Sequence, residues 1–251
     1  MQTKVKTADE IIAMRESGHM LATVLEYLKA NIKPGMTTQD MDDLAVAETK
    51  RLGGEPGFLG YQGFPRSLCI SINDEVVHGI PSKERVIKDG DLVSLDYGVR
   101  YKGMVTDAAR SVIVGTPKQR RHIELIERTA KSLDAGIAAV HDRVRTGDIG
   151  SSVEGYLKKF HYGIVRDLVG HGVGHHLHED PNIPNTGRAD TGPWLDAGMT
   201  IAIEPMVTLG TERVYVADDG WTIITADHSW AAHFEDTVLI TKDGAEILTR
   251  L

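Results

Sequence analysis

The feature that most constrains the fold of this 251-residue chain is an internal repeat of segments that end on acidic residues. Residues 90–96 match residues 198–204 in pattern, and each segment closes an apolar run, on Asp96 in one case and Glu204 in the other. A carboxylate that ends a buried strand must be paired, protonated or bound to a metal, because burying a bare charge is costly. The matched acids therefore indicate a function.

A second pair of segments repeats in the same order. Residues 106–114 are echoed by residues 234–240, which contain Asp107 and Glu235 respectively. Asp107 follows Asp96 across a turn at 102–103, and adjacent strands would bring these two acids together. Close carboxylates repel unless a proton or a cation lies between them.

Each pair of acidic segments is preceded by helical segments, of which residues 34–41 and 145–153 resemble one another. Each half thus supplies two helices followed by two acid-bearing strands. Because no Ser/Pro-rich linker separates the halves, we expect a single catalytic α+β domain over residues 1–251, in which two pseudo-symmetric halves face each other.

Caps and breakers predict the helices. The first expected helix begins at a capping box at 7–10 and ends before Pro34, and the second runs from about Thr38 to Gly53. The third begins at 116–117, and the fourth lies near 152–160.

Five residues have the character of metal ligands. They are Asp96, Asp107, His171, Glu204 and Glu235. Four carboxylates and one imidazole make a hard, oxygen-rich site with room for two divalent cations, a composition typical of dinuclear hydrolases.

Composition excludes several classes of protein. The apolar segments are too short to span a membrane, and the net charge of −8 argues against nucleic-acid specificity. The single cysteine, Cys69, excludes an intramolecular disulfide and fits a reducing compartment. The chain start lacks the apolar core of a signal peptide. We expect a cytoplasmic protein that does not contact membranes.

Histidines and glycines are dense in residues 171–178, and His78 stands in a loop before Gly79. Glycine lets the backbone approach a ligand closely, and neutral imidazole is a common ligand. A structural role remains open for His78, and we favour a structural role for His175 and His176.

An ordered set of motifs resembles type I methionine aminopeptidases of peptidase family M24. The motifs are residues 71–73, 78–81, 96–98, 106–107, 170–174, 178–181, 203–205 and 234–237. The resemblance implies the pita-bread (creatinase/aminopeptidase) fold, with two halves around a central antiparallel sheet. The chain resembles the short bacterial form, without an N-terminal zinc-finger extension or the helical insert of type II enzymes.

The resemblance also implies residue roles. Asp96 would bind one metal, His171 and Glu204 the other, and Asp107 and Glu235 would bridge both. His78 and His178 would contact substrate and act in catalysis together with Glu204. The methionine pocket would consist of Tyr61, Phe64, Cys69, Leu177 and Trp221. Phe64 stands where tyrosine is frequent and Leu177 where phenylalanine is frequent.

The implied function is removal of the initiator methionine from nascent proteins whose second residue is small. The implied cofactors are two divalent ions, of cobalt, manganese, iron, zinc or nickel. The expected partners are nascent N-termini and the ribosome, and the expected state is a monomer. The alternatives are an X-Pro-cleaving relative, which usually has an extra N-terminal domain, and a binding protein of this fold that has lost catalysis.

Overall fold

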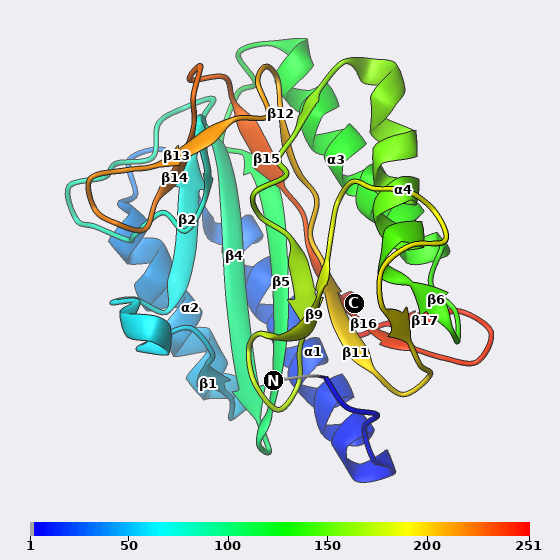
Figure 1. Cartoon of the computed structure of the whole chain (residues 1–251). Helices are drawn as coiled ribbons and strands as arrows, with labels where there is room; N and C mark the ends of the chain where they lie inside the picture. The colour runs from blue at the N-terminus through cyan, green and yellow to red at the C-terminus, as the bar shows by residue number, and fades with distance from the viewer. Residues whose placement is uncertain (1–2) are drawn as a thin grey trace.

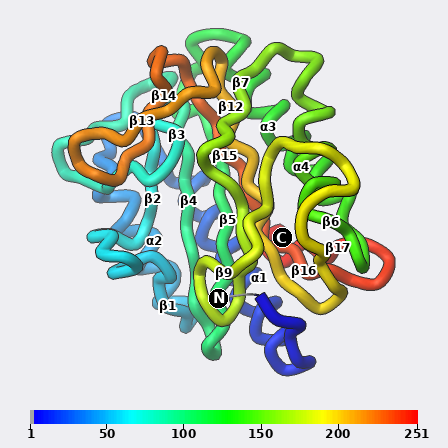
Figure 2. The backbone as a smooth tube through the Cα atoms, in the orientation of Figure 1, coloured from blue at the N-terminus to red at the C-terminus, as the bar shows by residue number. Residues whose placement is uncertain are grey.

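The computed structural model describes residues 3–251 as a mixed structure of helices and antiparallel strands (Figures 1 and 2). The expected α+β class is confirmed. The α-helices are α1 (Ala8–Asn31), α2 (Thr38–Leu52), α3 (Arg120–Ala138) and α4 (Thr146–Leu157), and the short 3₁₀ helices are η1 (Tyr61–Gly63) and η2 (Lys158–Phe160).

Four strands of the first half form one sheet. Its strands are β1 (Glu55–Pro56), β2 (Leu68–Ile72), β4 (Leu92–Tyr101) and β5 (Met104–Ile113). β4 pairs antiparallel with the other three. The β4–β5 turn consists of Lys102 and Gly103, whose φ angles are 48° and 81°. Two positive φ angles suit the tight turn of a twisted hairpin, and this turn fixes the register of the acids on β4 and β5.

The second half contributes a five-stranded sheet in the order β17-β16-β11-β8-β9. These strands are β8 (Gly170–Gly172), β9 (Glu179–Ile183), β11 (Thr200–Ile203), β16 (Asp236–Ile240) and β17 (Ala245–Ile247). An antiparallel bridge between Ala109 and Glu235 joins this sheet to β5. The Thr237 hydroxyl strengthens the junction by donating to Asp107 O (2.8 Å) and accepting from Asp107 N (2.9 Å).

Short strands form the remaining small sheets of the described residues. One three-stranded sheet contains β7 (Gly163–Ile164), β12 (Met206–Thr208) and β15 (Ala231–His233). Another contains β3 (Glu75–Val77), β13 (Val214–Val216) and β14 (Ile223–Thr225), and β6 (Val144–Arg145) pairs with β10 (Trp194–Leu195).

Helices cover the back of the sheets as seen in Figure 1, with α1 and α2 behind the first half and α3 and α4 beside the second. Leu21 and Leu25 of α1 pack with Met41 of α2 and Leu95 of β4 in one fully buried cluster. A separate cluster joins Leu133 of α3 to the second-half sheet. Each half therefore buries its own helix pair, as the sequence repeat predicted.

Several expected boundaries are wrong. α3 begins at Arg120, with Gln119 as N-cap, rather than at 116–117. The Thr116 N–H instead donates to Asp89 Oδ1 at 2.9 Å, which ties this segment to a neighbouring turn. α4 begins at Thr146, earlier than 152, and its last residues continue into η2. Asp96 lies inside β4 rather than at its end, because the hairpin extends the strand to Tyr101.

None of the helices in residues 3–251 combines the length and apolar character that a membrane crossing requires.

Candidate metal centre

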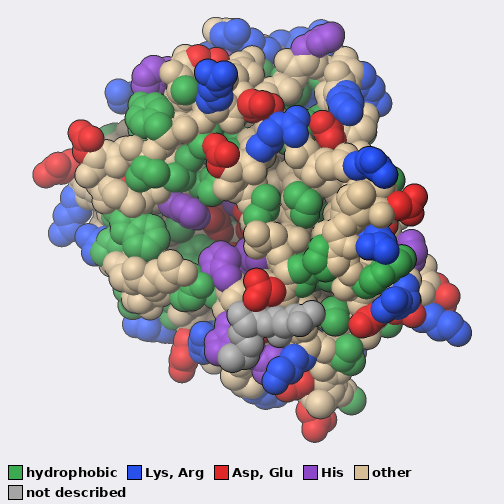
Figure 3. Space-filling view, in the orientation of Figure 1, with side chains coloured by type: hydrophobic (Ala, Val, Ile, Leu, Met, Phe, Trp, Pro, Cys, Tyr) green, Lys and Arg blue, Asp and Glu red, His purple; other side chains and the backbone are tan. Residues whose placement is uncertain are grey.

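A cavity of about 230 Å³ opens between the two halves. Figure 3 shows histidine and acidic side chains gathered in a hollow near the centre of the visible face. The lining residues are Phe58, Tyr61, Gln62, Phe64, Cys69, His78, Asp96, Asp107, His171, Leu177, His178, Glu204, Trp221 and Glu235. Every predicted site residue thus reaches a single cavity.

The first half contributes Asp96 and Asp107, both buried. Asp107 lies opposite Gly98 in the β4–β5 ladder, and Asp96 stands two residues before Gly98. Because side chains alternate between faces along a strand, the two carboxylates share one face of the hairpin. The hairpin register therefore produces the predicted pair.

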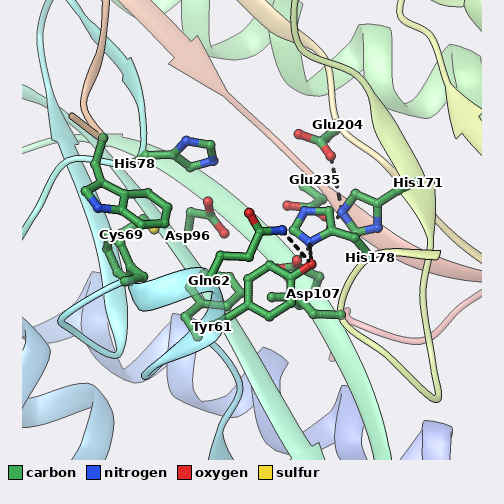
Figure 4. A pocket seen from close by; sticks show the side chains of 14 residues that line it. Tyr61, Gln62, Cys69, His78, Asp96, Asp107, His171, His178, Glu204 and Glu235 are labelled. Atoms are coloured by element: carbon green, nitrogen blue, oxygen red, sulfur yellow. Dashed lines mark hydrogen bonds and ion pairs between the residues drawn. The ribbon is translucent and has the colours of Figure 1, made fainter. Parts of the chain in front are cut away.

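The second half contributes His171 on β8 and Glu204 directly after β11. His171 Nδ1 lies 2.8 Å from Gly172 O, so this nitrogen carries the proton and donates it. The other ring nitrogen, Nε2, faces the acids: it lies 3.5 Å from Glu204 Oε1 and 3.9 Å from Asp107 Oδ2 (Figure 4). A backbone hydrogen bond of this kind orients a metal-binding imidazole.

Glu235 enters the cavity from the break between β15 and β16. Its N–H donates to Ala109 O at 3.0 Å. Arg110 Nη1 donates to Glu235 O at 2.5 Å, and Arg110 Nη2 donates to the Asp236 carboxylate at 2.7 Å. Contacts from β5 therefore fix the backbone on both sides of the Glu235 side chain.

Burial and crowding make four negative charges unfavourable in this cavity. Burial raises the pKa of Asp96 to about 8. Burial, together with the neighbouring carboxylates, also raises the pKa of Asp107, Glu204 and Glu235 well above the usual range. Burial lowers the pKa of His171 to about 3, so its imidazole is neutral near pH 7. The acids must bind either protons or cations.

The unpartnered atoms fit a metal rather than protons alone. Among the described residues, Asp96 Oδ1, Asp107 Oδ1 and Glu235 Oε1 are buried without a hydrogen-bond partner. Ligand atoms of Asp107, His171 and Glu235 lie within 4.8 Å of one another. Carboxylate oxygens and a neutral imidazole suit divalent transition metals. The centre is therefore suited to binding a divalent metal.

His178 lies at the mouth of the cavity beside Tyr61 (Figure 4). The Tyr61 hydroxyl is 3.0 Å from His178 Nδ1 and accepts from Gln62 Nε2 at 3.2 Å. If the hydroxyl donates its own hydrogen to Nδ1, the proton of the neutral imidazole resides on Nε2. Partial burial, with His78 nearby, lowers the pKa of His178, which favours this neutral form.

His78 follows β3 with a positive φ of 61° and lines the same cavity, next to the Cys69 side of the wall (Figure 4). Burial lowers its pKa. Its ring points into the cavity (Figure 4).

The cavity wall beside the acids is apolar. Phe64 is buried and packs edge-on against Trp221, with ring centroids 5.2 Å apart. Leu177 and Cys69 are buried in the same cluster. Burial and nearby carboxylates raise the pKa of the Cys69 thiol, so it remains uncharged. The five predicted pocket residues therefore form one hydrophobic wall beside the acids.

The structure adds residues that the sequence patterns did not single out. Phe58 and Gln62 also line the cavity, and His233 is buried next to Glu204 and Glu235. His233 precedes Glu235 by two residues, so the alternation of a β-type run could have indicated it. His175 is not among the cavity-lining residues, and its Nε2 lies 2.8 Å from Glu10 Oε1.

Comparison with known proteins assigns the chain to a class. The sequence profile of metallopeptidase family M24 matches residues 12–242. The chain belongs to metallopeptidase family M24.

Within this family, the chain is similar to proteins named methionine aminopeptidase. It is 46% identical to the one from Mycoplasma capricolum, over 98% of each chain. It is 43% identical to methionine aminopeptidase 1 of Bacillus subtilis, again over 98% of each. The predicted resemblance to methionine aminopeptidases is thereby confirmed, and the chain is a metallo-aminopeptidase.

Solved structures agree. The methionine aminopeptidase from Thermotoga maritima has a TM-score of 0.97 and 44% identity, and each chain is fully covered. The prolidase from Pyrococcus furiosus has a TM-score of 0.79 at 25% identity, but only 65% of that chain is covered. The shared region is the fold common to both proteins, and the expected pita-bread fold is confirmed.

Proposed function

We propose that this protein hydrolyses the peptide bond after an N-terminal methionine, with preference for a small second residue. The observation that carries this proposal is the apolar wall beside the carboxylate–histidine cluster within one small cavity. Its volume of about 230 Å³ is below the ~300–1,000 Å³ of sites for drug-sized ligands. The wall therefore suits a single apolar side chain, and the full-length similarity to methionine aminopeptidases supports methionine.

We infer that the centre holds two divalent ions. Four carboxylates and the His171 imidazole line one cavity, and this ligand set has room for two divalent ions. By the family resemblance, Asp96 would hold one ion and His171 with Glu204 the other, while Asp107 and Glu235 would contribute to both. A bound divalent ion supplies Lewis-acid chemistry that polarises a carbonyl and makes water easier to deprotonate.

The chain's own groups would then move the protons. A Glu204 carboxylate oxygen would accept the proton of the attacking water and later pass it to the departing amine. The His178 Nε2–H would donate to the carbonyl oxygen as negative charge develops there. His78 would contact the substrate from the opposite rim and hold the scissile bond in place.

The natural substrates in this proposal are the N-termini of newly made proteins in the cytoplasm. The protein would act there as a monomer, and it would associate with the ribosome. Sedimentation of the purified protein with and without ribosomes tests both statements. A dimer in solution, or no ribosome association at low salt, would contradict them.

The decisive assay compares peptides. The metal-loaded protein should release free methionine from Met-Ala-Ser and leave Ala-Pro peptides intact. Rapid cleavage of Ala-Pro with no methionine release would favour the X-Pro-cleaving alternative, which shares the fold. A protein that binds metal but cleaves neither peptide would favour the non-catalytic alternative.

A further inference from the structure

His233 is a buried imidazole next to the metal centre, at the end of β15. It is 2% exposed, and Nε2 lies 3.7 Å from Glu204 Oε2 and 3.9 Å from Glu235 Oε2. Neither ring nitrogen has a hydrogen-bond partner among the described residues. A polar side chain buried without a partner destabilises a fold, so its presence beside two acids requires an explanation.

The distances favour a shared ion over a direct hydrogen bond. An N–H···O bond requires the two heavy atoms to lie within ~3.2 Å, and both separations are longer. Atoms that bind one ion at ~2.0–2.2 Å stand roughly 3–4 Å apart. The ligand atoms of Glu204, His233 and Glu235 lie within 4.8 Å of one another, as do those of Asp107, His171 and Glu235.

The backbone that carries His233 is held by neighbouring strands. The Ser111 hydroxyl accepts from His233 N (2.9 Å) and lies 2.8 Å from His233 O, so a side chain of β5 holds the backbone. Met206 of β12 pairs with His233 on the other side. A backbone held between two strands limits where the ring can lie, and such preorganisation suits a metal ligand.

We propose that His233 Nε2 is a ligand of the divalent ion held by Glu204 and Glu235, so that the centre contains two imidazole ligands rather than one. This inference rests on the proposed metal centre and goes beyond the five-ligand set. Because imidazole suits zinc, copper, iron and nickel, while oxygen ligands suit magnesium and manganese, His233 should shift the preference of the centre toward the former metals.

The direct test is proton NMR of the protein loaded with two equivalents of Co²⁺. A histidine bound to Co²⁺ through Nε2 gives a strongly shifted Nδ1–H signal that disappears in D₂O. The wild type should show two such signals and His233→Gln only one. The matched control is His122→Gln, which alters a buried histidine stacked on Trp230 outside the centre and should retain both.

Calorimetric titration gives a second readout. Loss of groups that merely support a ligand costs ~10–100-fold in metal affinity, so His233→Gln should weaken Zn²⁺ and Co²⁺ binding at least that much. Mn²⁺ affinity should change less, and His122→Gln should leave all three affinities within about twofold.

One shifted signal in the wild type, or two in folded His233→Gln, would overturn the proposal. If His233→Gln does not fold by circular dichroism, His78→Gln and His178→Gln replace it. If both variants keep two shifted signals, neither His78 nor His178 binds the metal, which leaves His171 and His233 as the ligands. If either variant loses a signal, the histidine it replaces is the second ligand and His233 is rejected. None of these readouts uses methionine release, so rejection of His233 as a ligand leaves the proposed function separately testable.

Discussion

At the scale of single residues, the proton on His178 is the feature that links the site to its reaction. Gln62 donates to the Tyr61 oxygen, and the Tyr61 hydroxyl is 3.0 Å from His178 Nδ1. This short chain of hydrogen bonds favours a proton on Nε2, the nitrogen that must donate to the substrate carbonyl.

The first prediction compares His178→Ala with Tyr61→Phe. Losing a donor to the developing negative charge costs ~100-fold or more in kcat, so His178→Ala should keep its metal and a nearly normal KM. Tyr61→Phe keeps the aromatic ring in the pocket but removes the hydroxyl that favours a proton on His178 Nε2. Its kcat should therefore fall less, by about tenfold. Steady-state kinetics on Met-Ala-Ser, together with elemental analysis, measures both. Loss of metal from His178→Ala would make that residue a ligand and contradict its role as a donor to the substrate carbonyl.

The residues of the site were largely predictable because their chemistry is local to short motifs. The acids at 96, 107, 204 and 235 stand out in apolar runs, where an unpaired carboxylate is unfavourable. His233 was missed because a lone histidine in a strand resembles many structural histidines. Its closeness to Glu204 depends on the pairing of β12 with β15, a long-range contact that no local pattern encodes.

At the scale of elements, the two halves meet where β5 contacts β16. Thr237 is the link, since its hydroxyl bonds both backbone groups of Asp107. This link aligns an acid of the first half with the second-half sheet, so stability and metal binding should depend on the same hydroxyl.

The second prediction is that Thr237→Val, which preserves shape, destabilises the protein and weakens metal binding together. It leaves the buried N–H of Asp107 without its partner, which costs ~1–3 kcal/mol. Thr129→Val is the matched control, because the buried Thr129 hydroxyl donates only within its own helix, to Leu125 O. Urea unfolding and calorimetric metal titration measure both effects. Equal losses of metal affinity in the two variants would show that the Asp107 link has no special role.

Elements were predicted best where caps are strong. The Thr7 and Glu10 side chains form the expected capping box of α1, and α2 ends at a left-handed Gly53. The start of α3 was wrong because the 116–117 signal competes with the tertiary bond from Thr116 to Asp89. Local patterns cannot include such partners, so boundaries were less accurate than the number and order of helices.

At the scale of the whole molecule, the protein joins two halves around a centre that cannot remain fully charged by itself. The pKa of Asp96 is raised to about 8, compared with ~3.9 for an unperturbed aspartate. In the metal-free protein, Asp96 is protonated in both the folded and the unfolded state below about pH 4. As pH rises from about 4 toward 8, only the unfolded state loses this proton, so the free energy of unfolding falls. A bound cation should remove that loss.

The third prediction follows from this linkage. At pH 7 an ion must displace a proton from the acids, so affinity should weaken by about tenfold per pH unit as pH falls below 8, for each displaced proton. The gain in melting temperature on metal binding should correspondingly grow between pH 5 and pH 8. Calorimetry in buffers of different ionisation enthalpy counts the protons, and Asp96→Asn should release fewer. Metal affinity independent of pH would refute the protonated state of the acids.

The repeat predicted the two-half architecture because each half has its own helices and core. The relative placement of the halves was less accessible to sequence reasoning, since it depends on the Ala109–Glu235 bridge and on side chains such as Arg110. That placement determines which oxygens face one another and therefore how many ions the centre holds.

Methionine release by one preparation, measured before and after removal of its metal, decides whether the protein is a metal-dependent methionine aminopeptidase. The protein as purified should contain divalent metal by elemental analysis and release methionine from Met-Ala-Ser. Dialysis against a chelator should abolish release, and added Mn²⁺ or Co²⁺ should restore it. Full methionine release by protein verified to be free of metal would contradict this function, as would a metal-loaded, folded protein that releases none.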